Sequence, residues 1–399
     1  MEDRKFVRVH ESGAIDTAIM PEDCSIFSLD FEGTGVDPYE KDYAARLCQV
    51  SFDGEYAFIL NPDVHLEIMK QLVMDAELII VHNRSYDLVV FDHLYEIPLE
   101  FTWPKSADTQ DMARLLYPTD SAVLNDLARK FIPGAQDSDK ELKAEFKALK
   151  LTPIRTGYAR IPLDNEIYIR YGGLDAIYTF KLWQIWRERV NKDLMRAEDA
   201  LHFQSAAITR RGLLCDKIET RKQIAILNAG IRSASKRLDE IGIPIKVDTN
   251  EGREVIGEWL DYYGLDIAYS EKSVANFIAK TGQIPEGDDL YHCMKVGADD
   301  LRLMTMEADE FVRDVIADLI FIRQAEKIKV AYLEAFLKSS EVDGRVRPSI
   351  KTMAARTHRM SVSDPPLQQI PSHPIEVELT EQEWADLQAE LREIENADD

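Results

Sequence analysis

The sequence predicts an α/β domain followed by a mostly helical region. Short apolar runs alternate with segments of helical periodicity over the first 190 residues. Two of these runs, at 24–29 and 78–81, lead directly into polar and acidic residues, as at the strand ends that form the sites of α/β sheets. From residue 191 onward the apolar residues recur mainly at helical spacing.

Length and composition narrow the class of protein. A chain of 399 residues exceeds one typical core and predicts two or three domains. Its apolar runs are far shorter than the roughly 20 residues that span a bilayer, so no membrane partner is expected. The charged N-terminus lacks the apolar segment of a secretory signal. Four widely spaced cysteines without a CxxC pair favour neither structural zinc nor disulfides, which fits a reducing cytoplasm.

The first strands form a meander. Residues 24–29, 47–52 and 56–60 have the apolar character of strands, and Asp53-Gly54 marks the hairpin turn between the last two. The elements that follow are expected to be a helix at 64–74, a strand at 78–81, a helix at 86–95, a helix capped by Asp108, two short helices, a polar loop at 137–150 and a helix at 165–190.

Two carboxylates stand at the end of the first strand. Asp30 and Glu32 are two residues apart, so their side chains point to the same face of the strand. Two like charges so close are costly unless a cation or a proton lies between them. Oxygen ligands of this kind suit Mg²⁺ or Mn²⁺, and Gly33 and Gly35 permit a sharp turn beyond them. The alternative is a solvated strand end before a turn.

A second acidic position lies on the long helix. Tyr171 and Asp175 are four residues apart and share one helical face. The alternative is that Tyr171 packs and Asp175 is solvated. However, Asp175 lies between small and apolar residues, where an unpaired carboxylate would be expensive, so we expect it to have a positive partner.

The net charge of −24 argues against nucleic-acid binding over the whole surface but allows a local basic path. Residues 194–208, 218–241 and 308–339 are expected to be helical, with short helices between 242 and 306. The segment 323–359 holds nine Lys or Arg and four acids, which makes it net +5 in an acidic chain. It is a candidate phosphate-contacting surface, although a basic face can also be merely solvated.

The tail has the opposite character. Residues 373–399 contain ten acids and one arginine. Thr380 and Glu383 form a capping box, and an apolar stripe follows. This acidic amphipathic helix either packs on its own chain or docks on a partner.

The N-terminal half resembles the 3′–5′ exonucleases of the DEDD class, tyrosine subtype. Asp30-x-Glu32, Asn83-x-x-Tyr86-Asp87 and Tyr171-x-x-x-Asp175 match its three motifs in order. The resemblance implies a ribonuclease-H-like fold and two divalent ions, Mg²⁺ or Mn²⁺.

The resemblance also implies residue roles. Asp30, Glu32 and Asp175 would hold one metal, Asp30 would bridge to a second, and Asp87 would support that second metal through water. Tyr171 would orient the attacking water, because an unperturbed tyrosine is a poor base. Asn83 and Tyr86 would shape the pocket for the terminal nucleotides. The family commonly has threonine at the position of Gly33, so a hydroxyl near the substrate end is missing.

The second half resembles the thumb of family A DNA polymerases, of bacterial and phage type. The resemblance lies in the stretches 344–349, 355–361 and 363–372, with Thr357-His358-Arg359 where the family usually has Thr-Gly-Arg, and the whole match spans about 22–372. It implies an exonuclease domain at 1–190, a thumb-like region at 191–372 and an acidic tail at 373–399. The candidate duplex-contacting residues are Arg345, Arg347, Lys351, Arg356 and Arg359.

No palm or fingers motif follows Ser372. We therefore expect a proofreading-type exonuclease that acts on single-stranded DNA 3′ ends in replication and cannot polymerise alone. A phage source and the cytoplasm of a bacterial or infected cell fit this prediction. The alternatives are a DNA-binding or assembly subunit completed by a separate palm-fingers polypeptide, and an RNase D-like exoribonuclease.

Overall fold

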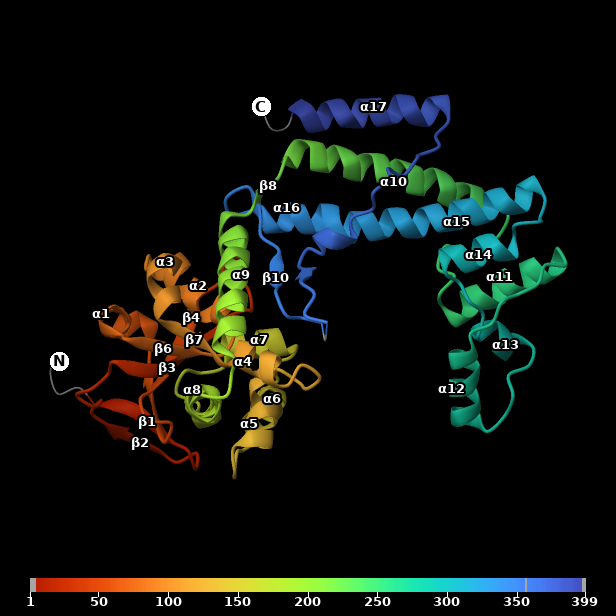
Figure 1. Cartoon of the computed structure of the whole chain (residues 1–399). Helices are drawn as coiled ribbons and strands as arrows, with labels where there is room; N and C mark the ends of the chain where they lie inside the picture. The colour runs from red at the N-terminus through yellow and green to blue at the C-terminus, as the bar shows by residue number, and fades with distance from the viewer. Residues whose placement is uncertain (1–4, 356, 397–399) are drawn as a thin grey trace. The chain divides into compact units, whose positions relative to one another are not determined.

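The structure, a computed structural model, describes residues 5–355 and 357–396, with only the backbone of Arg155 (Figure 1). Over this range the chain forms two compact units. The first combines the residues up to 213 with 341–364, and the second combines 214–340 with the residues from 365 onward. These units do not coincide with the predicted ranges, because the helix that follows residue 191 packs within the first unit and the tail packs within the second.

The first unit is built on a seven-stranded sheet of order β2-β1-β5-β4-β3-β6-β7. β3 pairs antiparallel with β4 and parallel with β6, and β6 pairs parallel with β7. The strands are β1 (Phe6–His10), β2 (Ile15–Ala18), β3 (Ile26–Gly33), β4 (Ala45–Ser51), β5 (Tyr56–Leu60), β6 (Leu78–Val81) and β7 (Ser106–Asp108).

Helices cover both faces of this sheet, and β3 shows how the faces differ. Phe27, Leu29 and Phe31 join an apolar core with α1 and α2, while Asp30 and Glu32 on the alternate positions face α8. The helices of this unit are α1 (Pro62–Asp75), α2 (Arg84–Tyr95), α3 (Leu99–Thr102), α4 (Thr109–Leu116), α5 (Leu124–Phe131), α6 (Ser138–Ala148), α7 (Ile154–Arg160), α8 (Glu166–Trp186) and α9 (Lys192–Arg211).

The predicted polar loop at 137–150 is wrong, because this segment forms α6. The Asp137 side chain accepts a hydrogen bond from the Lys140 amide and caps the helix. Leu142 and Phe146, one turn apart, are buried in the cluster that includes α8 residues. Two further strands that were not predicted, β1 and β2, extend the meander beyond β5.

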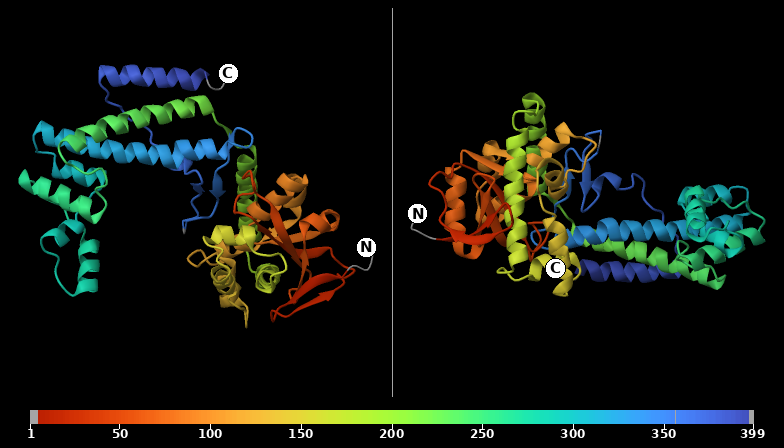
Figure 2. Two further views of the ribbon diagram at one scale, coloured as in Figure 1. Left: turned by 180° about the vertical axis from the view of Figure 1, so that it is seen from behind. Right: turned by 90° about the horizontal axis from the view of Figure 1, so that it is seen from below.

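The second unit is helical, as predicted. The long helices α10 and α15 lie side by side (Figure 2). α15 continues through a π-helical segment (Lys329–Glu334) into α16. The helices of this unit are α10 (Lys217–Glu240), α11 (Asn250–Tyr262), α12 (Glu271–Thr281), α13 (Asp288–His292), α14 (Ala298–Met304), α15 (Glu310–Ile328), α16 (Ala335–Ser339) and α17 (Glu381–Asn396). The short strands of the chain form two small sheets outside the seven-stranded one. They are β8 (Leu213–Leu214) with β9 (Arg345–Val346), and β10 (Ser349–Lys351) with β11 (Ser361–Ser363).

The acidic tail packs on its own chain. α17 lies along α10 (Figure 1), and Leu387 is buried against Ala225 and Ala229. The Glu383 carboxylate accepts hydrogen bonds from the amide and hydroxyl of Thr380, which confirms the predicted capping box. In the described part of the chain, no helix is both long and apolar enough to cross a bilayer.

Candidate active site

Three carboxylates converge between β3 and α8. One oxygen from each of Asp30, Glu32 and Asp175 lies within 4.8 Å of the others. Glu32 and Asp175 are only 6% and 5% exposed, and Asp30 is half-buried. The sheet therefore places the carboxylates of Asp30 and Glu32 on one face. The helix α8, which covers that face, contributes the third carboxylate, that of Asp175.

The electrostatics of this acidic trio, Asp30, Glu32 and Asp175, call for a cation. Burial, and then repulsion from neighbouring carboxylates, raises the pKa of all three well above the ordinary values. The buried Asp175 Oδ1 has no hydrogen-bond partner among the described residues. The positive side-chain partner predicted for Asp175 is likewise not found in the described part of the chain. An all-oxygen, buried and uncompensated donor set fits a divalent cation of the Mg²⁺ or Mn²⁺ type.

Arg46 is a cationic side chain that acts on Glu32, but its guanidinium hydrogen-bonds backbone carbonyls. Arg46 lowers the pKa of Glu32, but only as the smallest of the influences on that group. Its guanidinium donates to the carbonyl oxygens of Tyr158 and Ile161, each at 2.5 Å. Arg46 lies where the β3–β4 register shifts beyond Glu32, and it thereby ties α7 to the edge of the site.

Two glycines let α8 approach the sheet. A Cβ at Gly172 would lie 2.4 Å from Gln49 Nε2, and a Cβ at Gly173 would lie 2.6 Å from Val9 Cγ2. Any larger residue at these positions would push α8 away from β1 and β4. The Gly172-Gly173 pair therefore sets the depth at which Tyr171 and Asp175 meet the strand carboxylates.

Asp87 reaches the site from the first turn of α2. Its Oδ1 accepts a hydrogen bond of 2.9 Å from the Phe31 amide, between the two carboxylates of β3. Burial raises the pKa of Asp87, and its charge in turn raises the pKa of Asp30. Asp87 is not one of the three residues whose ligand atoms lie within 4.8 Å of one another.

Tyr171 stands beside Asp175 on α8. Burial, followed by the charge of Asp175, raises the pKa of Tyr171 well above 10, so the phenol stays protonated at neutral pH. The Tyr171 hydroxyl in turn favours the ionised form of Asp175. A second tyrosine, Tyr158, lies alongside with ring centroids 6.4 Å apart. Tyr171 can therefore donate a hydrogen bond in this site but is unsuited to act as a base.

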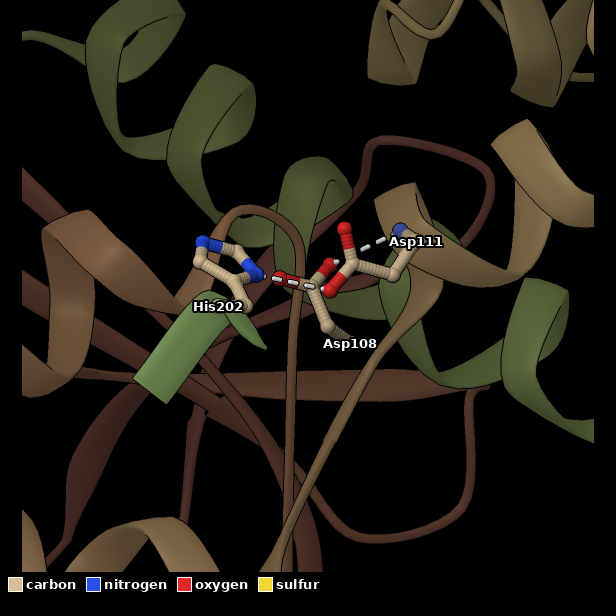
Figure 3. A group of neighbouring side chains, drawn as sticks. All are labelled: Asp108, Asp111 and His202. Atoms are coloured by element: carbon tan, nitrogen blue, oxygen red, sulfur yellow. Dashed lines mark hydrogen bonds and ion pairs between the residues drawn. The ribbon is translucent and has the colours of Figure 1, made fainter. Parts of the chain in front are cut away.

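A second cluster contains Asp108, Asp111 and His202 (Figure 3). His202 Nδ1 lies 2.8 Å from Asp111 Oδ2, and the buried Arg84 guanidinium lies 3.4 Å from Asp111 and 3.9 Å from Asp108. Arg84 also pairs with Asp199. This cluster already contains its cation, so the arrangement is that of a buried ion-pair network.

That network holds the start of α2. The Asp108 carboxylate caps α4, as predicted, by accepting from the Gln110 amide. The same carboxylate accepts from the amides of Asn83 and Arg84, at 3.1 and 2.9 Å. Asn83 adopts a left-handed conformation, with φ of 79°, immediately before α2. Asp108 thus fixes the turn from which Tyr86 and Asp87 project.

The candidate DNA-contacting residues fall within the segment 341–364. Arg347 is half-buried, forms an ion pair with Asp343 and lies 4.7 Å over the Tyr39 ring, and Arg345 donates to the Arg211 carbonyl. Lys351 and Arg359 are exposed, whereas Arg356 lies outside the described residues. The segment 323–359 is also divided between the two units, because the first unit takes up the chain at 341.

Comparison with known proteins assigns this site to a class. Residues 10–191 match the family described as 3'-5' exonuclease, in the form found in family A DNA polymerases. The matched region contains all five predicted exonuclease residues, from Asp30 to Asp175. Residues 10–191 are therefore similar to the 3′–5′ exonuclease domains of family A DNA polymerases.

Similar proteins include phage DNA polymerases. The DNA polymerase of Mycobacterium phage D29 is 25% identical over 384 residues, which cover 92% of this chain and 57% of that polymerase. The DNA polymerase of Mycobacterium phage L5 is 24% identical, with 92% and 58% covered. DNA polymerase DpoZ of Salmonella phage PMBT28 is 22% identical. The chain thus spans a little over half the length of these relatives.

The fold matches a solved polymerase domain. The structure titled POL domain of Pol1 from M. smegmatis, in complex with DNA primer-template and dNTP, aligns with a TM-score of 0.53 and 17% identity. The alignment covers 88% of this chain and 53% of that one. The similarity therefore includes the helical second unit as well as the sheet.

Proposed function

We propose that this chain is a metal-dependent 3′–5′ exonuclease of the proofreading type, which removes nucleotides from single-stranded DNA 3′ ends during replication. The observation that carries the proposal is the buried acidic trio of Asp30, Glu32 and Asp175 within a region that matches a 3′–5′ exonuclease family. The reaction adds water across the terminal phosphodiester, releasing a nucleoside monophosphate and leaving a 3′-hydroxyl on the shortened strand.

Asp30, Glu32 and Asp175 would hold one divalent ion, and Asp30 and Asp87 would help to hold a second. Mg²⁺ or Mn²⁺ bound there would activate water and neutralise charge on the departing 3′ oxygen. The hydrogen bond from the Phe31 amide keeps the Asp87 carboxylate at the edge of β3. A cation bound between acidic groups whose pKa is raised lowers their pKa values and so favours the ionised carboxylates at neutral pH.

Tyr171 orients the reacting groups. Since its raised pKa keeps the phenol protonated, it donates a hydrogen bond rather than removing a proton. Asn83 and Tyr86, on the turn anchored by Asp108, line the approach of the terminal nucleotides.

DNA is the proposed substrate in both units. The single-stranded 3′ end would enter the acidic site, and duplex DNA would contact the thumb-like second unit and the exposed Lys351 and Arg359. Arg345 and Arg347 fix the chain that precedes Lys351, because they donate hydrogen bonds to the carbonyls of Arg211 and Arg210 respectively. Because no palm or fingers motif occurs in these 399 residues, we expect no primer extension from them alone.

The test is Mg²⁺-dependent release of nucleoside monophosphates from a 5′-labelled single strand that shortens from its 3′ end. Replacing Asp30 and Glu32 with alanine should abolish the release. Equal release by wild type and this double variant would overturn the proposal.

Two further assays address the alternatives. Preference for RNA over DNA in a competition assay would favour the exoribonuclease. Primer extension that appears only when a palm-fingers polypeptide is added would favour the subunit of a split polymerase, in which hydrolysis is secondary.

A further inference from the structure

The helix α9 packs against α2, the helix that carries Asp87. Ala206 of α9 is buried in the apolar core that also contains Phe91 of α2. Phe203 of α9 packs at the edge of the same core, where its ring centroid lies 5.6 Å from that of Trp103. Apolar packing brings the two helices together, but because it is non-directional it does not by itself fix how α2 is placed along its axis.

Two ion pairs of opposite polarity also join the helices. At the start of α2, the Arg84 guanidinium pairs with Asp199 of α9. Further along α2, the Asp92 carboxylate accepts a hydrogen bond of 2.9 Å from the Arg210 guanidinium of α9. Along the chain, α2 thus presents a cation and then an anion, whereas α9 presents an anion and then a cation. These two pairs are called the α9 clamp below.

Further contacts hold the α9 side chains of the clamp in place. The Asp199 carboxylate accepts a hydrogen bond of 3.2 Å from Trp103 Nε1. The Arg210 guanidinium donates a second hydrogen bond of 2.9 Å to Glu100. Arg84 is only 1% exposed, so the loss of an anionic partner would leave part of a buried charge uncompensated. The α9 clamp therefore differs from a pair of isolated surface ion pairs.

The α9 clamp fixes both the axial position and the rotation of α2. Positions 84 and 92 lie about 12 Å apart along a helix, and a shift by one residue moves a side chain by about 1.5 Å and turns it by about 100°. Such a shift of α2 would separate both ion pairs at once. Asp87 lies between the two clamped positions, so both pairs set its place.

Asp87 needs such support because the nearby Asp30 carboxylate repels it. The charge of Asp87 raises the pKa of Asp30, and the Asp87 carboxylate accepts a hydrogen bond from the Phe31 amide, next to Asp30 on β3. Ionised carboxylates so close together move apart unless a cation or a rigid support keeps them in place. The two ion pairs with α9 oppose that movement, because they restrain the helix on which Asp87 stands.

We infer that Asp199 and Arg210 are positioning residues for Asp87, which the α9 clamp holds beside Asp30, where a second divalent ion would bind. This inference rests on the proposed function, because it assigns Asp87 to that ion. Both residues act through α2. Replacing a residue that orients a metal ligand typically lowers metal affinity or activity by about 10–100-fold.

The first experiment measures Mn²⁺ binding to the full chain by calorimetry. Arg210→Met should weaken the weaker of two Mn²⁺ binding steps about tenfold and leave the tighter step unchanged. Arg210→Lys keeps the charge and should lose less affinity. The matched control is Arg196→Met, which removes an exposed ion pair with Asp193 from the same helix and should bind Mn²⁺ like wild type. An unchanged weaker step in Arg210→Met would overturn the inference.

The second experiment separates positioning of Asp87 from a general structural effect. In single-turnover hydrolysis of a DNA strand, Arg210→Met should lower the rate about tenfold in wild type but by less than about twofold in Asp87→Ala, because the clamp acts through Asp87. Asp199→Asn, which keeps an oxygen for Trp103 Nε1, should give the same pattern and replaces Arg210→Met if that variant does not fold. An equal loss with and without Asp87 would overturn the inference.

The two experiments also distinguish this inference from the proposed function. Wild type that binds two Mn²⁺ ions but hydrolyses no single strand would refute the proposed function, and calorimetry of Arg210→Met would still test the clamp. Wild type that binds a single Mn²⁺ ion at saturation would overturn the inference, whatever its activity.

Discussion

Asp175→Asn should stabilise the metal-free protein while it abolishes hydrolysis. Ligand atoms of the acidic trio lie within 4.8 Å of one another, and with an effective dielectric constant of about 20 each ionised pair at that distance costs about 3.5 kcal/mol. Protonation of a carboxylate limits this electrostatic cost, because keeping a carboxyl group protonated costs about 1.4 kcal/mol for each pH unit above its pKa. We therefore expect a gain of about 1–3 kcal/mol at pH 8.

The pH dependence gives the sign of the effect. The pKa values of Asp30, Glu32 and Asp175 are raised in the folded state, so the folded protein retains protons that the unfolded chain releases. The contribution of these three groups to the stability of the metal-free wild type should therefore be greatest below their unfolded pKa values, near 4, and fall as the pH rises towards the folded values. Asp175→Asn should flatten this fall, and Mg²⁺ should reverse it in wild type.

Thermal unfolding in chelator from pH 5 to pH 9 measures this directly. At pH 8 the Asp175→Asn variant should melt at least about 2 °C above wild type, because each kcal/mol corresponds to about 2–4 °C for a unit of this size. The matched control is Asp164→Asn at an exposed position, which should not shift the midpoint. A variant less stable than wild type in chelator would refute the claim that the trio is uncompensated without a cation.

Four further substitutions test other parts of the site and fold. Tyr171→Phe should lower kcat by about 10²-fold or more with little change in the Mg²⁺ affinity measured by calorimetry, and an unchanged kcat would exclude the positioning role. Gly172→Ala should lower the melting temperature and the activity, and Gln49→Ala in the same chain should restore part of both; failure of that rescue would contradict the close approach of α8. Arg84→Met should destabilise the first unit by about 3–5 kcal/mol in urea unfolding, because it leaves buried carboxylates without their cation; a loss under 1 kcal/mol would contradict the network. Leu387→Ala should increase amide hydrogen exchange along α17, and exchange equal to wild type would argue against its packing on α10.

Features that depend on local sequence were predictable. The alternation of apolar and helical segments placed β3, β6, α2 and α8 within a few residues of their observed positions. The convergence of Asp30, Glu32 and Asp175 followed from strand alternation, helical spacing and the order of the motifs. The capping box of Thr380 and Glu383 could be predicted because it involves only four consecutive residues.

Features that depend on tertiary contacts were not predictable. His202 meets Asp111 across 91 positions in the chain, and no local pattern marks either residue. The 137–150 segment is so polar that its sequence does not mark a helix, since Leu142 and Phe146 are the only large apolar residues on its buried face. Arg210 meets Asp92 across 118 positions in the chain, so the α9 clamp appears only when α2 and α9 are brought together.

The most direct test of the metal site is anomalous diffraction from crystals soaked in Mn²⁺. The proposed metal site predicts at least one manganese peak beside Asp30, Glu32 and Asp175, and no peak at Asp108, Asp111 and His202, where Arg84 supplies the charge. A peak at the second cluster, or none between the three carboxylates of β3 and α8 at saturating Mn²⁺, would contradict it.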